Sequence, residues 1–173
     1  MDQIEGTLAA AIYEDGKQYL GLASVKMPDI EYGTFTLSGL GLCGEAEYGA
    51  LCQFKPMKMT LNFSETSEAF HLLSEQRMHM ITIDVCKQTH DYSGRQLHTT
   101  GVKHVLQVQP LKKEGGTIAP ASQQNVAVEF SVFMHKEMID EKVVRHIDVI
   151  NYINVGYDGV DIAEPIRKAL GMA

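Results

Sequence analysis

The glycine-rich segment 39–44 is the first place in the sequence where residue types and spacing could do chemistry. Its residues, Gly-Leu-Gly-Leu-Cys-Gly, satisfy the GxGxxG pattern that holds the pyrophosphate of a dinucleotide. That site requires a helix directly after the glycines, because the helix N-terminus binds the phosphates. The chain continues instead through Glu45 and Glu47, whose carboxylates would repel a pyrophosphate, into an alternating strand. We therefore interpret the glycines as a flexible loop or hairpin and expect no bound cofactor.

Histidine and cysteine, two side chains that often bind metals or act in catalysis, show no recognisable spacing either. The seven histidines form neither an HExxH motif nor a zinc-finger pattern, so we expect isolated structural or surface histidines and no metal site. Cys43 and Cys52 lie almost symmetrically about a turn expected at Glu47 and Tyr48, and a hairpin could place them opposite each other. We expect them to be free thiols in a reducing compartment. No GxSxG motif is present, so the sequence indicates no catalytic site and we do not expect an enzyme.

Alternation of apolar and polar residues with a period of two dominates the rest of the chain. It is clearest in residues 57–63, 126–134 and 143–155. Successive side chains of a strand point to opposite faces, so each segment should bury one of its faces. We predict a mainly β protein of the α+β class, built as an antiparallel β-barrel or sandwich. The segment 143–155 also carries apolar residues on its second face, which another segment or a neighbouring chain must cover.

Two helices interrupt the predicted strands. We expect one over residues 64–77, with Ser64 as its N-cap, and one over residues 161–170, where Asp161 and Glu164 stand at capping spacing. Residues 112–125 are expected to form an exposed loop. Turns are expected at residues 14–17, 45–49, 91–94 and 139–141. No linker or repeat divides the chain, so we predict a single domain over residues 1–173.

Composition and charge exclude several classes of protein. The sequence has 173 residues, 45% of them hydrophobic, which is enough for a core that needs no disulfide or metal. Fifteen Lys and Arg against 22 Asp and Glu give a formal charge of −7, which disfavours a dedicated nucleic-acid binder. The N-terminus is acidic and no apolar run has the length of a membrane span, so we expect no membrane binding. Amphipathic strands without evident chemistry favour self-assembly through strand edges.

Two motifs near the ends of the chain match one known family. The first runs from Tyr13-Glu14-Asp15-Gly16 to Val25-Lys26-Met27-Pro28. The second is His146-Ile147-Asp148-Val149-Ile150-Asn151, followed by Gly159-Val160-Asp161 and a closing helix. With the order of hairpin, helix, strands and final hairpin between them, the chain resembles the major tail tube proteins of contractile-tailed bacteriophages. The chain resembles the tube protein of a related R-type bacteriocin equally well, because that tube uses the same parts.

The resemblance implies a structural role and a set of partners. Subunits of the tail-tube type form hexameric rings, and these rings stack into the hollow inner tube of a contractile tail. The partners would be further copies of the chain, the sheath, and baseplate or terminator proteins. DNA would only pass through the lumen, and only in a phage; the acidic balance suits such a passage. The protein would be assembled in the bacterial cytoplasm and would reside in the virion or a tail-like particle.

Two segments are expected to act as assembly loops, at about residues 14–23 and 33–53. The individual candidates for subunit contacts are Asp15, Gly16, Tyr19, Gly39, Gly41, Gly44, Tyr48 and Tyr152. Two alternatives remain open. A small-molecule- or cofactor-binding β-barrel would be a closed monomer or dimer that carries a ligand. A tube subunit of a type VI secretion system would share the ring-forming fold.

Overall fold

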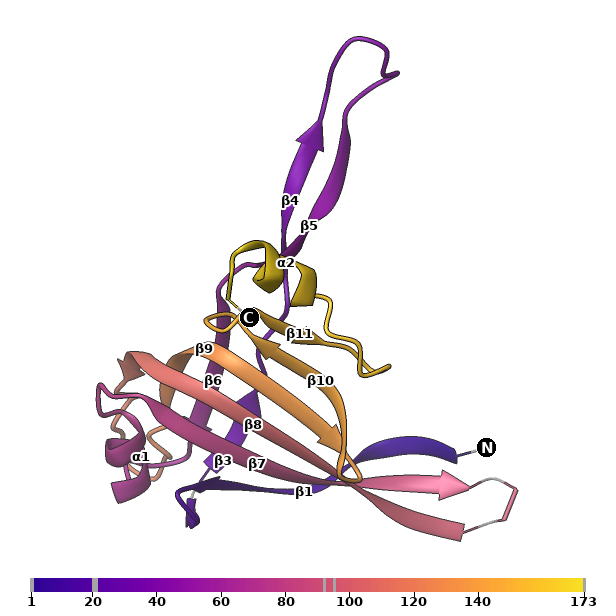
Figure 1. Ribbon diagram of the computed structural model, residues 1–173. Coiled ribbons are helices and arrows are strands. Elements are labelled where there is room, and N and C mark those ends of the chain that lie inside the picture. Colours follow the sequence, from indigo (N-terminus) through magenta and orange to yellow (C-terminus); the bar gives the residue numbers. More distant parts are fainter. Residues whose placement is uncertain (1, 20–21, 92, 95, 173) are drawn as a thin grey trace.

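Long antiparallel strands make up most of the computed structural model, which describes residues 2–19, 22–91, 93–94 and 96–172 (Figure 1). The described residues form one nine-stranded sheet and a separate two-stranded hairpin. The strands of the large sheet are β1 (Asp2–Glu14), β2 (Lys17–Tyr19), β3 (Leu22–Lys26), β6 (Met57–Phe63), β7 (His79–Asp91), β8 (Gln96–Glu114), β9 (Val126–Ile139), β10 (Lys142–Asp148) and β11 (Ile153–Val155). The hairpin consists of β4 (Tyr32–Leu37) and β5 (Ala46–Phe54).

Strand β9 organises the large sheet because it changes partners along its length. Its whole length pairs with β8 on one side, with a register shift between Gln107 and Val108. On the other side, residues 126–132 pair with β6, whereas residues 134–139 pair with β10. The main path is β11-β10-β9-β8-β7-β1-β2, and β3 joins through β6. The prediction of a mainly antiparallel β protein is confirmed, but no ladder among the described strands closes this sheet into a barrel.

The core lies on one face of this sheet and follows the alternation in the sequence. In β6, every second residue is buried in the core. These residues are Met57, Met59, Leu61 and Phe63, none of which is more than 1% exposed. Helix α1 (Glu68–Leu73) adds Phe70 and Leu73. The other strands contribute Ile12, Ile81, Ile83, Leu106, Val108, Val126, Val128, Phe130, Val132 and Ile147.

One buried polar pair joins β1 to β7 beside this core. His79 Nδ1 lies 2.6 Å from Glu14 Oε1, and His79 Nε2 lies 3.0 Å from the carbonyl oxygen of Glu75. Both side chains are almost completely buried. A buried carboxylate without a partner would be costly, so this contact has a structural role.

Both helices are shorter than the sequence predicted. The N-cap of α1 is Ser67, whose Oγ accepts a hydrogen bond from Phe70 N at 3.2 Å; the predicted cap, Ser64, is wrong. The carbonyl of Ser64 is instead bound by Asn125 N at 3.0 Å, so this stretch is tied to the loop before β9. Helix α2 spans Glu164–Ala169 and follows Ala163 as its cap.

The turns at residues 14–17 and 139–141 lie where they were predicted, whereas the turn predicted at 45–49 does not. The turn predicted at 91–94 includes residue 92, which lies outside the described residues. Strand β5 begins at Ala46, and Phe35 is in register with Tyr48, so the hairpin turns within residues 38–45. Cys43 therefore lies in the tip and Cys52 near the base of the same arm, and the predicted symmetric placement is wrong. Strand β8 continues to Glu114, so the exposed loop is limited to residues 115–125.

Candidate assembly surfaces

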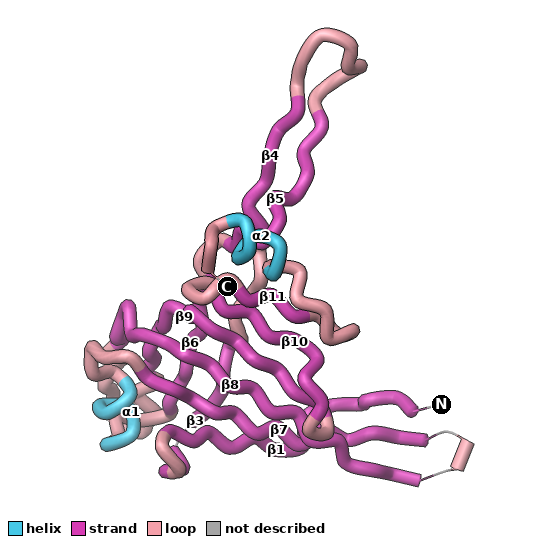
Figure 2. Tube along the Cα trace, viewed as in Figure 1, coloured by secondary structure: helices cyan, strands magenta, loops and turns pink. Residues whose placement is uncertain are grey.

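The β4–β5 hairpin projects away from the large sheet as a separate two-stranded ribbon (Figure 2). Two aromatic pairs hold its strands together. The ring centroids of Tyr32 and Phe54 are 5.5 Å apart, and those of Phe35 and Tyr48 are 5.8 Å apart. At the tip, Gly41 adopts a φ of +96°, which side chains other than glycine rarely tolerate. The glycines are thus a requirement of the turn rather than a phosphate site.

This hairpin is covered with exposed apolar side chains. Leu40, at the tip, is fully exposed. The other large apolar residues exposed along the ribbon are Tyr32, Phe35, Leu37, Leu42, Tyr48 and Leu51. An isolated two-stranded ribbon is at best marginally stable in water, and contiguous exposed apolar patches usually mark an interaction site. The hairpin is therefore the strongest candidate for a contact with another protein chain.

The C-terminal segment forms a second exposed apolar surface, held to the protein by polar contacts. No residue of α2 is buried. Arg167 Nη1 donates hydrogen bonds to the Tyr152 carbonyl and to Asp161 Oδ2, both at 2.5 Å. The exposed apolar residues around these contacts are Val149, Ile150, Tyr157, Val160, Ile162, Leu170 and Met172.

Asp161 is the centre of these polar contacts. Its carboxylate accepts hydrogen bonds from Asn154 N at 3.1 Å and Ala163 N at 3.0 Å, in addition to the bond from Arg167. Partial burial by itself would raise the pKa of Asp161, but these donors outweigh it and keep the pKa below its ordinary value. The carboxylate is therefore ionised at neutral pH and fixes α2 to β11.

A third candidate surface is the free edge of β1. Among the described residues, β1 pairs with β7 along its length, but only Ile12–Glu14 pair with β2. The backbone groups on the outer edge of residues 2–11 therefore face no strand in the part of the chain that the structure describes. Such an edge can accept a strand from another chain.

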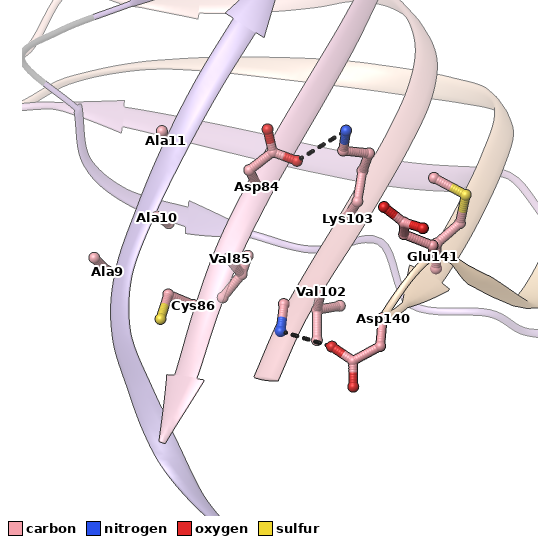
Figure 3. A pocket seen from close by; sticks show the side chains of 12 residues that line it. Ala9, Ala10, Ala11, Asp84, Val85, Cys86, Val102, Lys103, Asp140 and Glu141 are labelled. Carbon is pink, nitrogen blue, oxygen red and sulfur yellow. Dashed lines mark hydrogen bonds and ion pairs between the residues drawn. The ribbon is translucent and has the colours of Figure 1, made fainter. Parts of the chain in front are cut away.

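A depression of about 900 Å³ lies beside this edge (Figure 3). Small residues of β1, including Ala9, Ala10 and Ala11, line one side of it, and Asp140 and Glu141 lie at another. Three of its charged groups are engaged: Asp84 and Lys103 are 3.6 Å apart, and Asp140 accepts a hydrogen bond from Gly101 N at 3.1 Å. No histidine is among its lining residues, which include the thiol of Cys86 and the carboxylates of Asp84, Asp140 and Glu141.

The structure places the predicted contact residues at separate sites. Gly39, Gly41 and Gly44 lie together in the hairpin tip, and Tyr48 lies on β5 below them, half exposed. Asp15 and Gly16 form the exposed turn between β1 and β2, with φ angles of +50° and +76°. Tyr152 lies in the turn before β11, where its carbonyl binds Arg167. Tyr19 lies in β2, and its side chain is outside the described part of the chain.

Two groups of residues were not among the predicted contacts. The leucines of the hairpin and Phe35 are exposed apolar residues, and their apolar character was visible in the sequence. The histidines were expected to be isolated, and this is wrong for one pair. His104 Nδ1 lies 3.2 Å from His135 Nε2.

Comparison with known proteins identifies the family of the chain. The model of the family described as phage tail tube protein FII matches residues 8–171, nearly the whole chain. The chain belongs to the phage tail tube protein FII family. The resemblance drawn from the two terminal motifs is thereby confirmed. No curated protein sequence matches this tail tube protein significantly.

Solved structures share the fold of this tail tube protein at low sequence identity. A chain of the sheath-tube complex of an extracellular contractile injection system, PVC, in the extended state is 14% identical with a TM-score of 0.53; the match covers 75% of this chain and 87% of that one. A chain of the PVC sheath/tube terminator is 13% identical with a TM-score of 0.53 and coverages of 76% and 94%. A chain of the anti-feeding prophage cap, a tube terminating cap, is 12% identical with a TM-score of 0.53 and coverages of 75% and 87%.

Family membership makes this tail tube protein a structural component of a virion or tail-like particle. A family of structural tube proteins suggests a structural rather than an enzymatic role. None of the helices in the described part of the chain is long and apolar enough to span a membrane.

Proposed function

We propose that this tail tube protein forms hexameric rings that stack into the hollow inner tube of a contractile phage tail or a tail-like bacteriocin. The observation that carries the proposal is the projecting β4–β5 hairpin, which exposes a continuous set of apolar side chains on a chain of the tail tube family. Burial of exposed apolar area against another surface is favourable, and larger patches of this kind usually mark an interaction site. A second copy of the same chain supplies that surface in a tube.

Within a ring, the contacts are head to tail. The free edge of β1 at residues 2–11 and the short edge strand β11 lie at different ends of the sheet order. A head-to-tail contact joins two different surfaces of identical subunits, and it closes into a ring when the rotation between subunits divides a full turn. Ring closure would also pair strand edges that the isolated subunit leaves open.

Between rings, a different surface is required, and the β4–β5 hairpin suits this role. It projects beyond the large sheet, so it can reach a neighbouring ring (Figure 1). The turn at Asp15 and Gly16 is a second, polar contact, as the sequence predicts. Tyr48 and the glycines of the tip act with Leu40 as one apolar contact surface.

The partners of the assembled tube are the sheath and the baseplate or terminator proteins. Similar folds occur in a sheath-tube complex and in two tube-terminating assemblies, which supports this set of partners. In a phage, DNA passes through the lumen without a dedicated binding site, because the subunit carries a net charge of −7. We propose no organic cofactor and no membrane contact for the subunit itself.

A small-molecule-binding barrel and a type VI secretion tube are less well supported. The first requires a closed barrel, and the described strands do not close. The second lacks support from the family match, which is to a phage tube model.

Negative-stain electron microscopy of the purified protein over a concentration series tests the proposal. We expect rings at low concentration and hollow rods of uniform width at high concentration, with six-fold symmetry in end-on class averages. A monodisperse monomer or closed dimer at every concentration, even after addition of preformed tube ends, would contradict it. Native mass spectrometry of that species would then detect the ligand that the barrel alternative requires.

A further inference from the structure

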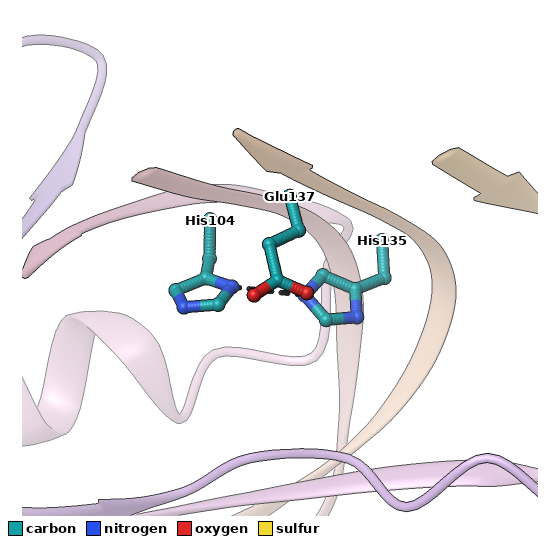
Figure 4. A group of neighbouring side chains, drawn as sticks. All are labelled: His104, His135 and Glu137. Carbon is teal, nitrogen blue, oxygen red and sulfur yellow. Dashed lines mark hydrogen bonds between the residues drawn. The ribbon is translucent and has the colours of Figure 1, made fainter. Parts of the chain in front are cut away.

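Three side chains that commonly bind metal ions converge on the core-facing side of β8 and β9. His104 lies on β8 directly opposite Glu137 on β9, and His135 is two residues before Glu137, so all three project from the same face of the sheet. Figure 4 shows the Glu137 carboxylate beside the line that joins the two imidazole rings. One nitrogen of each ring and one carboxylate oxygen lie within 4.8 Å of one another.

The distances suit a single ion at the centre of this group. A tetrahedral zinc ion with bonds of about 2.1 Å holds its ligand atoms about 3.4 Å apart. His104 Nδ1 and His135 Nε2 are 3.2 Å apart, close to that separation. One carboxylate oxygen of Glu137 lies within 4.8 Å of both ring nitrogens, so it would have to move closer to become the third ligand.

Burial disfavours the charged form of both imidazoles. Burial lowers the pKa of His135 to about 4, with the neighbouring His104 as a further cause. Burial also lowers the pKa of His104. A neutral imidazole carries one nitrogen lone pair that can bind a metal ion.

The protein leaves this group incompletely satisfied. His135 is only 4% exposed, yet its Nδ1 has no hydrogen-bond partner in the described structure. A neutral ring has one N–H and one lone pair, so one of the two nitrogens of His135 lacks a complementary partner in either tautomer. A cation bound at Nε2 would replace the contact with His104 and fix the proton on Nδ1, whose N–H would still lack an acceptor among the described residues.

We propose that His104, His135 and Glu137 form a binding site for one divalent first-row transition-metal ion, such as zinc. Two imidazoles and one carboxylate select such an ion over magnesium or calcium, which prefer oxygen ligands. The fourth position would be open to water. Arg145, in register with Glu137 on β10, and Lys87 on β7 add positive charge nearby, which opposes any cation, so the affinity must come from the two imidazoles and the carboxylate.

The position of the site gives the ion a structural role. The β8–β9 ladder shifts register between Gln107 and Val108, and β9 exchanges β6 for β10 at the same level. His135 follows this shift directly. An ion bound to residues of both strands would fasten them together where their ladder is interrupted, and it would stabilise the folded subunit because it binds only the folded arrangement.

Zinc binding to the purified chain, stripped with EDTA, tests the site. Isothermal titration calorimetry should show one zinc ion bound per subunit, and a rise in melting temperature should accompany it. Cobalt added in place of zinc should give the visible absorption of a four-coordinate N/O site. The variants His104→Gln and Glu137→Gln avoid the fully buried position 135, and each should weaken zinc binding by at least about tenfold.

His98→Gln is the matched control, because His98 is an exposed histidine on the same strand, β8. It should bind zinc as the wild type does. Circular dichroism and the melting temperature in EDTA must show that each variant is folded; a variant that is not folded is replaced by His104→Ala at the same half-buried position. The proposal is overturned if wild-type protein binds no zinc, if magnesium displaces zinc, or if folded His104 and Glu137 variants bind zinc as tightly as wild type and His98→Gln do.

Discussion

At the scale of single residues, Asp161 shows how much one carboxylate can organise. It joins β11, the turn before α2 and the helix itself through donors from Asn154, Ala163 and Arg167. Because α2 buries no apolar side chain, these bonds hold a segment that packing does not. The attachment of the helix should therefore weaken when this one side chain is altered, although Arg167 keeps its bond to the Tyr152 carbonyl.

We predict that Asp161→Asn lowers the free energy of unfolding by about 1–3 kcal/mol, since it removes the charge from several hydrogen bonds at once. Urea unfolding at pH 7 measures this change. Hydrogen exchange should locate the loss in residues 153–172 rather than in the core. Glu164→Gln, which alters an exposed carboxylate of the same helix, is the control and should leave exchange at Asn154 unchanged.

The pKa of Asp161 sets the pH range of this effect. The folded pKa lies below the ordinary value of 3.8, so the unfolded chain binds more protons in the range between the two values. The stabilisation is complete above about pH 4 and disappears as the pH falls through the folded pKa. Wild type and Asp161→Asn should thus converge in acid; an undiminished difference at pH 2 would contradict the assignment.

At the scale of elements, the β4–β5 hairpin is the part whose stability depends most on a partner. Leu40 is fully exposed at its tip, and burial of one leucine contributes about 1.5–3 kcal/mol. In a stacked tube this gain occurs at every subunit. The hairpin is therefore the element through which stacking can be altered while the core stays intact.

We predict that Leu40→Asp raises the protein concentration needed for rods by at least about tenfold, because it loses that burial and adds a charge that must be desolvated. Rings should remain visible by electron microscopy. Leu40→Met, which keeps an apolar side chain of similar volume, should assemble as the wild type does. Normal rods from Leu40→Asp would exclude the tip from the contact between rings.

The elements also show what could be predicted from the sequence. The alternation of apolar and polar residues predicted β6 and β9, because in both strands buried residues largely alternate with more exposed ones. The turn predicted at residues 45–49 from their composition is wrong. Most of this segment belongs to β5, where the Phe35–Tyr48 contact and the hydrogen bond from Thr34 to Glu47 join it to β4. These are contacts between strands, which local composition does not encode.

The His104–His135–Glu137 group was beyond prediction for a related reason. A period of two places His135 and Glu137 on one face, but their partner on β8 depends on the register shift between Gln107 and Val108. One residue of slip would point His104 to the opposite face. The candidate assembly residues were easier to predict from the sequence, because turns and glycines are local signals. That they contact other subunits stays a prediction.

At the scale of the whole molecule, charge opposes assembly and apolar area favours it. Each subunit carries −7, so neighbouring subunits repel one another over a distance set by the ionic strength. We predict that rods form at lower protein concentration in 200 mM than in 10 mM NaCl, because screening reduces this repulsion while apolar burial persists. Sedimentation and light scattering measure it. Rods that dissolve as salt is added would show that ion pairs, rather than apolar contacts, hold the tube.

The 19-residue strand β8 has a mechanical consequence. It is hydrogen-bonded to β7 from Val108 to Gln96 and to β9 from Val102 to Glu114. A pull along β8 loads the bonds of both ladders in shear at the same moment, whereas a pull that separates the arms of the β4–β5 hairpin breaks its bonds one after another. The subunit is thus stiff along its sheet and compliant at its projecting ribbon, so under load the ribbon yields first while the frame that carries it keeps its shape.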